Sequence, residues 1–216
     1  MIFNSPKQKV FRYFSTFYFM IAFYTCDALR LYLERVYKMS LDRFFFWVVP
    51  TFFFVIFILH KNPFDYLKLR NHVKTGVFWG IAISAIHALI FYSYWLWKGT
   101  EINFNLGFGV YWGRIIMAGI NEEIVFRGLV LQNLQETYSF GRSNVISSFL
   151  FVIAHLPYWY VWGRFSGPLM PVIYDVIFLF AMGLFWGFLV KKTNSLWSSI
   201  IHHSVNNLLV LSIWRP

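Results

Sequence analysis

Long apolar runs separated by short polar segments dominate this chain. Several runs approach the ~20 residues that an α-helix needs to cross the apolar core of a bilayer. The runs predict spans near residues 13–31, 44–60, 76–97, 145–162, 172–190 and 196–214. The segment 107–138 is also helical in pattern, although ionisable residues interrupt it. The pattern predicts an all-α, polytopic membrane bundle of about seven to eight transmembrane helices, with residues 1–216 forming a single transmembrane domain.

Composition supports a membrane protein. Of the 216 residues, 58% are hydrophobic and only 13% are charged, against about 25% charged in ordinary soluble domains. The formal net charge is +10, but the basic residues flank apolar runs, which indicates contact with anionic lipid headgroups and not with nucleic acid. Cys26 is the single cysteine, so an intramolecular disulfide is excluded.

The basic residues also predict an orientation. With the N-terminus in the cytoplasm, the segments 61–74 and 191–192 lie inside, as the positive-inside rule requires. The basic loop 35–43 violates the rule in this orientation.

Three ionisable side chains, Glu122, Glu123 and Arg127, stand within otherwise apolar sequence. A charge within a membrane is costly, so it indicates a functional site. Glu123 and Arg127 are four residues apart, with the acid first, and can neutralise each other on one helix face. Glu122 is rotated by about 100° from Glu123 and is left as the free carboxylate, which suits a general base. Such a helix must be shielded by its neighbours or broken near Gly119.

Two later spans carry polar residues that suit the same chemistry. His155 lies within one span, and His203 and Asn207 lie one turn apart in the last. One glutamate and two histidines can polarise a water molecule, while an imidazole and an amide can donate hydrogen bonds to the oxyanion of a tetrahedral intermediate. Glu122, His155 and His203 also match a catalytic zinc set, so both metal-dependent and metal-free water activation stay open.

Several features have a structural interpretation. Buried polar residues often hold membrane helices together. We interpret His87, the single histidine of its span, as such a buried hydrogen-bonding group. Gly183 and Gly187 are four residues apart, which predicts a close approach between helices. The acidic motif, His155 and the pair His203 and Asn207 follow one another in apolar helices. Together they favour a functional site over purely structural contacts.

In combination, these residues resemble the three motifs of the CPBP family of intramembrane proteases, which includes the type II CAAX prenyl proteases and bacteriocin-processing (Abi) proteins. The resemblance covers residues 107–211, a CPBP-like catalytic core, and its motifs are Glu122-Glu123-x-x-x-Arg127, Phe151-x-x-x-His155 and His203-x-x-x-Asn207. It implies a membrane endopeptidase in which Glu122 and His155 activate water and His203 and Asn207 form the oxyanion hole. Glu123 and Arg127 are implied as supporting residues.

The third motif has an alternative register. His202-x-x-x-Asn206 fits it equally well by spacing alone. His203 and Asn207 are preferred because the family places its histidine at this distance from a Ser-Leu-Trp sequence, here residues 195–197.

The resemblance also implies the biological setting. We expect a membrane-associated peptide or protein as the substrate, lipidated substrates included, and a multi-pass protein of a prokaryotic plasma membrane with its site open to the cytoplasm. A non-catalytic bacteriocin-immunity or scaffold protein of the same fold is the alternative. A transporter that uses the acids and histidines as a proton relay is least favoured, since the sequence has no internal symmetry.

Overall fold

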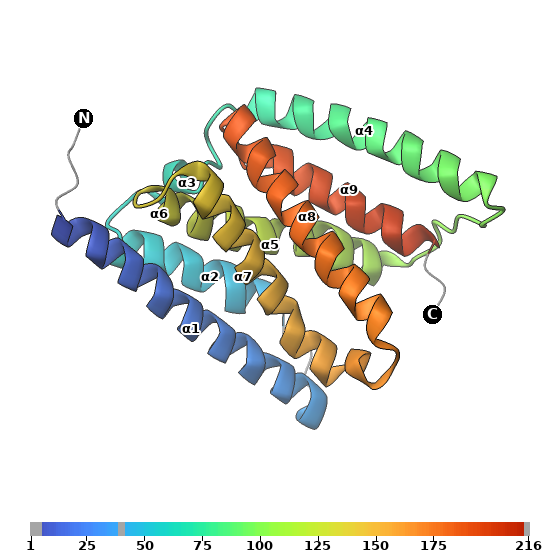
Figure 1. Cartoon of the computed structure of the whole chain (residues 1–216), viewed down its shortest axis with the longest axis horizontal. Helices are drawn as coiled ribbons and strands as arrows, with labels where there is room; N and C mark the ends of the chain where they lie inside the picture. The colour runs from blue at the N-terminus through green and yellow to red at the C-terminus, as the bar shows by residue number, and fades with distance from the viewer. Residues whose placement is uncertain (1–5, 39–41, 214–216) are drawn as a thin grey trace.

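The computed structural model describes residues 6–38 and 42–213, and all regular structure within those ranges is helical (Figure 1). The last residue of the predicted span 196–214, and the segments 1–5, 39–41 and 214–216 of the predicted domain, lie outside the described residues. The elements, in chain order, are α1 Pro6–Tyr37, α2 Arg43–Phe53, the π-helix η1 Phe54–Ile58, α3 Pro63–Tyr66, α4 Val73–Trp97, the π-helix η2 Val110–Met117, α5 Ala118–Glu123, the π-helix η3 Ile124–Val130, α6 Leu131–Gln135, α7 Phe140–Val161, the 3₁₀ helix η4 Arg164–Ser166, α8 Leu169–Thr193 and α9 Trp197–Ile213.

Local sequence explains where several helices begin and end. Asp42 caps α2 by accepting a hydrogen bond from the backbone N–H of Phe44, at 2.8 Å. Asn62 caps α3 in the same way, with Pro63 in the first turn, where its missing N–H costs nothing. Gly163 follows α7 with a φ of 71°, and Asn194 ends α8 with a φ of 51°. Glycine and asparagine tolerate this left-handed conformation better than other residues.

Three helices of the described chain are long and apolar enough to cross a membrane: α4, α7 and α8. The other predicted spans also form helices, but α2 and η1 together make a shorter apolar helix, α9 has 17 residues, and the remaining two are more polar. The predicted count of seven to eight crossings is therefore not confirmed, while the all-α fold is confirmed for the described residues, with three helices that could cross a membrane.

The helices form two groups with the acidic segment between them. Figure 1 shows α4, α8 and α9 on one side and α1, α2 and α7 on the other. α4 packs along α9, and α7 packs against both α1 and α8. The predicted close approach at Gly183 and Gly187 is confirmed: a Cβ atom at Gly183 would lie 2.9 Å from Ser148, and one at Gly187 would overlap the side chain of Asn144.

The segment predicted at 107–138 is shielded and not broken. Helical structure runs from Val110 to Gln135 without interruption at Gly119, and its side chains are buried from Asn121 to Leu134. The two π-helices within it release backbone carbonyls from the helix ladder. Near η3, the hydroxyl of Ser147 donates to the carbonyl of Phe126, and the amide of Gln132 donates to the carbonyl of Arg127, each at 2.8 Å.

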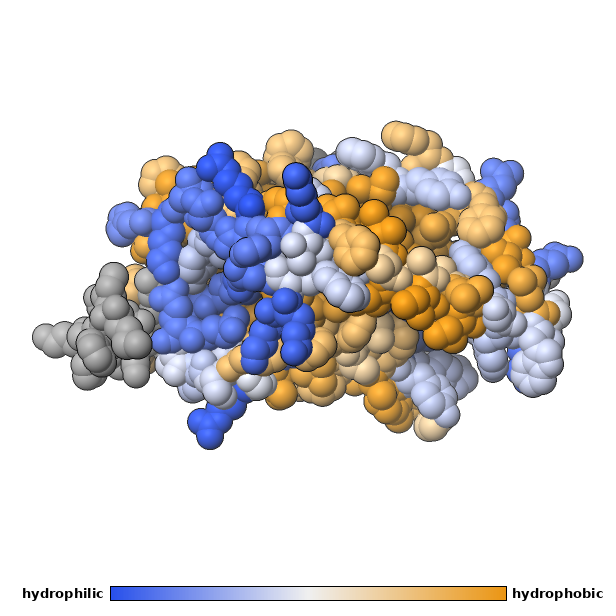
Figure 2. Space-filling model, turned by 90° about the horizontal axis from the view of Figure 1, so that it is seen from above, coloured by the Kyte–Doolittle hydropathy of each residue, from blue (hydrophilic) through white to orange (hydrophobic). Residues whose placement is uncertain are grey.

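The surface separates a basic end from an apolar belt. Figure 2 shows hydrophilic residues gathered at one end of the molecule, with an apolar region beside them. Exposed basic residues lie on the loop before α4 and at the ends of α4, α7 and α8, namely Arg70, Lys74, Arg142, Lys191 and Lys192. These ends meet in space, because the N–H of Leu196 bonds to the carbonyl of Lys68, at 3.1 Å, and the Lys191 ammonium lies over the Phe140 ring.

Candidate functional site

The two neighbouring acids lie on α5, deep in the protein. The relative exposure of Glu122 is 5% and that of Glu123 is 0%. Gly119, one turn earlier, allows α5 to lie directly against α9, because a Cβ atom there would overlap the Ser204 hydroxyl and lie 3.3 Å from the Ile200 carbonyl. This close packing brings both carboxylates to the face of α9 that carries His203.

Glu123 forms the ion pair with Arg127 that the sequence predicts. Glu123 Oε1 lies 3.2 Å from Arg127 Nη1, and both side chains are fully buried. The Arg127 guanidinium also lies against the rings of Phe151 and Trp186, with its carbon 4.5 and 5.2 Å from the ring centroids. These cation–π contacts and the pair supply the attraction that a desolvated charge requires.

His203 bridges the two acids. Its Nδ1 lies 2.9 Å from Glu123 Oε1, and its Nε2 lies 3.5 Å from Glu122 Oε2. A carboxylate can only accept, so Nδ1 carries the proton of this hydrogen bond. The ring also stacks on Trp186, with centroids 3.8 Å apart and an angle of 14° between the planes. The two acids and Trp186 together fix the position and the orientation of the His203 ring.

Glu122 is not the free carboxylate that the sequence predicts. Arg43 Nη1 lies 3.5 Å from its Oε1, while His203 faces its other oxygen. Arg43 is the first residue of α2, and its guanidinium lies 5.8 Å from the ring centroid of Trp47 and 5.6 Å from that of Tyr158. Sequence reasoning missed this contact across 79 positions. The available signal was that Arg43 belongs to the basic loop that violates the positive-inside rule.

His155 lies beside this network on α7. Its Nδ1 lies 2.9 Å from the carbonyl oxygen of Phe151, which can only accept, so Nδ1 carries a proton and Nε2 of the neutral ring is an acceptor. The Phe151 ring contacts both imidazoles, with centroids 4.8 Å from His155 and 6.1 Å from His203. Glu122 and Arg43 are close enough to act electrostatically on His155.

Asn207 has a different neighbour. Its amide donates to the carbonyl of Arg114 in η2, at 3.2 Å. Its role as an oxyanion donor stays a prediction.

The alternative histidine of the third motif faces away from the acids. The indole N–H of Trp186 donates to His202 Nδ1, at 3.0 Å, and the His202 ring stacks on His87, with centroids 5.2 Å apart. His202 therefore holds α8 and α4 against α9. The interpretation of His87 as a buried hydrogen-bonding group is wrong for Nδ1, because this atom has no hydrogen-bond partner among the described residues. Its aromatic stacking on His202 is the contact that joins the helices.

The described residues give the predicted zinc set no support, and it stays a prediction. Within residues 6–38 and 42–213, no three His, Cys, Asp or Glu side chains gather as the ligands of a metal ion would. Among the candidates Glu122, His155 and His203, both imidazoles use Nδ1 for protein partners.

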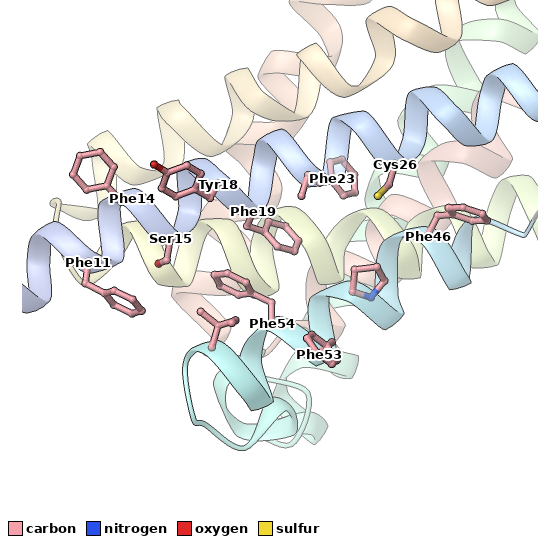
Figure 3. A pocket seen from close by; sticks show the side chains of 13 residues that line it. Phe11, Phe14, Ser15, Tyr18, Phe19, Phe23, Cys26, Phe46, Phe53 and Phe54 are labelled. Carbon is pink, nitrogen blue, oxygen red and sulfur yellow. The ribbon is translucent and has the colours of Figure 1, made fainter.

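A separate groove lies between α1 and the α2–η1 helix (Figure 3). It encloses about 510 Å³, and its lining is almost entirely apolar and rich in aromatic rings, Phe19, Phe23 and Phe54 among them. None of the predicted site residues lines it. The polar chemistry is thus confined to the interface of α2, α5, η3, α7 and α9.

Comparison with known proteins gives one family. Residues 105–209 match the model described as type II CAAX prenyl endopeptidase Rce1-like. The match includes α5, η3, α7 and most of α9, with both acids, His155 and His203, and excludes α2 with Arg43. Neither the curated proteins nor the solved structures include a significant match to the chain.

Proposed function

We propose that the protein is an intramembrane endopeptidase that uses Glu122 as its general base, a proposal supported by the match of residues 105–209 to the type II CAAX prenyl endopeptidase Rce1-like family model. One observation carries the proposal. The Glu122 carboxylate and the His203 imidazole, from helices 81 positions apart, meet at 3.5 Å in a buried interior. A titratable pair of this kind is costly to bury, and its position beside His155 suits activation of a water molecule.

The surrounding contacts give each group a defined task. Glu122 accepts a proton from the water while His155 Nε2 accepts a hydrogen bond from the other O–H group. The water oxygen then forms a bond with the carbonyl carbon of the scissile peptide, whose π electrons become the oxyanion. When the intermediate collapses, the C–N bond breaks and the proton on Glu122 passes to the leaving nitrogen.

Glu123 and Arg127 support this chemistry without touching the reacting atoms. Their fully buried pair fixes Nδ1 of His203, so the imidazole keeps its Nε2 toward Glu122. A site held in this way loses little freedom when the substrate reacts.

The surface suggests how the substrate is presented. α4, α7 and α8 are long enough to cross a bilayer, and many exposed side chains around them are apolar. A membrane-anchored peptide, with a prenyl group as the family description names, would reach the site from within or beside the lipid. The basic end formed by the loop before α4 and the end of α8 is the side that we place in the cytoplasm.

The test is cleavage of an internally quenched, farnesylated peptide with a C-terminal CAAX sequence by the protein in proteoliposomes. The Glu122→Gln variant keeps the shape of the side chain but removes the base, so its rate should fall by about 100-fold or more. Cleavage at the wild-type rate would refute the assignment. Binding of the peptide by a wild-type protein that never cleaves it would support the non-catalytic alternative.

Two adjacent histidines provide a matched control. His203→Gln should lower kcat by about 100-fold, because the imidazole facing Glu122 is lost. His202→Gln removes a ring that contacts Trp186 and His87 instead, so the folded fraction should keep a kcat within about threefold of wild type. Equal losses in both variants would contradict the choice of His203.

A further inference from the structure

Arg43 has the features of a cation that can change partners. It lies outside the family-matched residues, at the start of α2, and reaches Glu122 with one nitrogen at 3.5 Å. Charge-assisted hydrogen bonds are usually about 2.7–2.9 Å long, so this contact is loose. The Arg43 side chain is 33% exposed, and its guanidinium lies near the Trp47 and Tyr158 rings. These rings attract the cation but do not use its N–H donors in hydrogen bonds of normal strength.

The proposed reaction moves negative charge away from the group that Arg43 pairs with. Before the reaction, Glu122 is a carboxylate and Arg43 is its counter-ion. When Glu122 accepts the proton from water it becomes neutral, and the negative charge appears on the former carbonyl oxygen of the substrate. The total charge is unchanged, but a guanidinium binds an anion more strongly than it binds a neutral acid.

We propose that Arg43 transfers its ion pair from Glu122 to the oxyanion and is thereby a catalytic residue of the endopeptidase. The inference rests on the proposed function. A guanidinium has five N–H donors in a rigid fork, so one can leave Glu122 while another reaches a neighbouring oxygen. Because the new anion exists only after the proton transfer, the interaction strengthens in the transition state and accelerates the chemical step.

The other polar groups of the site already have partners. His203 turns its Nε2 toward Glu122, and Asn207 donates to the Arg114 carbonyl. Arg127, the other cation of the network, is fully buried between aromatic rings and paired with Glu123. Arg43 is the partly exposed cation at Glu122, and so it is placed to meet a substrate that arrives at this acid.

The experiment compares Arg43→Ala, Arg43→Lys and wild type on the farnesylated peptide described above. Arg43→Ala should lower kcat by about 100-fold and leave KM within about twofold, as expected when an oxyanion donor is removed. Arg43→Lys should recover part of this loss, and guanidinium chloride at a few tens of millimolar should raise the kcat of Arg43→Ala by about tenfold. Arg70→Ala, which removes an arginine that also contacts an aromatic ring, Phe64, is the matched control and should leave kcat unchanged.

A second readout does not depend on turnover. A phosphinate analogue of the same peptide carries a tetrahedral anion in place of the scissile bond. Its affinity should fall by about 100-fold in Arg43→Ala, while the affinity of the intact peptide for the inactive Glu122→Gln protein should change less than threefold when Arg43→Ala is added. Retained near-ultraviolet circular dichroism would show that the variants are folded.

The outcomes separate the two proposals. If Arg43→Ala keeps its wild-type kcat while Glu122→Gln is inactive, the role of Arg43 is refuted and the endopeptidase assignment stands. A loss confined to KM, or a loss of kcat that neither lysine nor guanidinium reduces, would also refute the ion-pair transfer. If Glu122→Gln cleaves normally, the proposed function itself is refuted.

Discussion

The two neighbouring glutamates form two different ion pairs. Glu123 and Arg127 are both fully buried, at 3.2 Å, whereas Glu122 pairs at 3.5 Å with Arg43, whose side chain is 33% exposed. The first pair joins residues four positions apart on one continuous helix, and the second joins different helices. The comparison shows that adjacent acids of the same type can divide their tasks, because one partner is enclosed and the other can exchange.

The difference follows from the surroundings of each cation. Arg127 is enclosed by Phe151, Trp186 and the space that Gly183 leaves open, since a Cβ atom at Gly183 would lie 2.9 Å from Arg127 Nη2. Arg43 has aromatic neighbours as well, but a third of its side chain is exposed, so a new partner can reach it. A cation without access to a new partner holds its acid permanently, so the enclosed pair is structural.

Arg127→Met is the strongest test of the enclosed pair. It leaves Glu123 buried without its cation, so the free energy of unfolding should fall by about 3–5 kcal/mol. Arg43→Met leaves the buried Glu122 with His203 as a neighbour and removes a cation that is 33% exposed, so it should cost less, about 1–2 kcal/mol. Thermal or denaturant unfolding of the detergent-solubilised protein measures both.

The double variant Arg127→Met, Glu123→Gln is the control for this prediction. Replacing the uncompensated carboxylate by an amide should restore part of the lost stability. Equal costs for Arg127→Met and Arg43→Met would show that enclosure does not distinguish the pairs.

The sequence predicts the enclosed pair but not the open one. The Glu123–Arg127 contact depends only on helical spacing, and its prediction is confirmed. Arg43 meets Glu122 through the packing of α2 against α5, which no local pattern contains. The same limit applies to the π-helices η2 and η3 and to the number of membrane crossings. The π-helices and the number of crossings depend on how neighbouring helices shield polar segments. The hydropathy of one segment does not contain this information.

The two adjacent histidines of α9 show what spacing along one helix can and cannot predict. Spacing allows either His202 or His203 in the third motif, and the family resemblance favours His203. In the structure His203 faces both acids, while His202 faces Trp186 and His87. The catalytic roles of His155, His203 and Asn207 stay predictions, and the His203→Gln variant in the peptide assay tests that of His203.

Gly119→Ala tests the close packing that gives both acids their partners. The added methyl group would overlap the Ser204 side chain and crowd the Ser204 backbone nitrogen, at 3.2 Å. α5 and α9 must then separate, which should cost about 1–3 kcal/mol of stability and reduce peptide cleavage by moving Glu122 away from His203.

Gly113→Ala is the matched control in the preceding turns of the same helical segment. Nothing lies within 4 Å of a Cβ atom at Gly113, so alanine should be neutral or stabilise by about 0.4–1 kcal/mol through the unfolded chain. If Gly119→Ala behaves like Gly113→Ala, the contact between α5 and α9 is not what positions the acids.

Arg164→Ala extends the comparison to an exposed ion pair and should have the smallest effect. Arg164 Nη2 lies only 2.7 Å from Asp175 Oδ2, closer than either pair at the two glutamates, but the side chains are 45% and 39% exposed. Water screens both charges and solvates each one when the other is removed, so the loss should be about 0.2–1 kcal/mol with an unchanged rate of peptide cleavage. Unfolding measured at low and high salt would show the screening directly. A cost as large as that of Arg127→Met would mean that distance matters at least as much as exposure in these pairs. The expected order follows the exposure of the side chains instead, because the shortest of the three pairs is the most exposed and should cost the least.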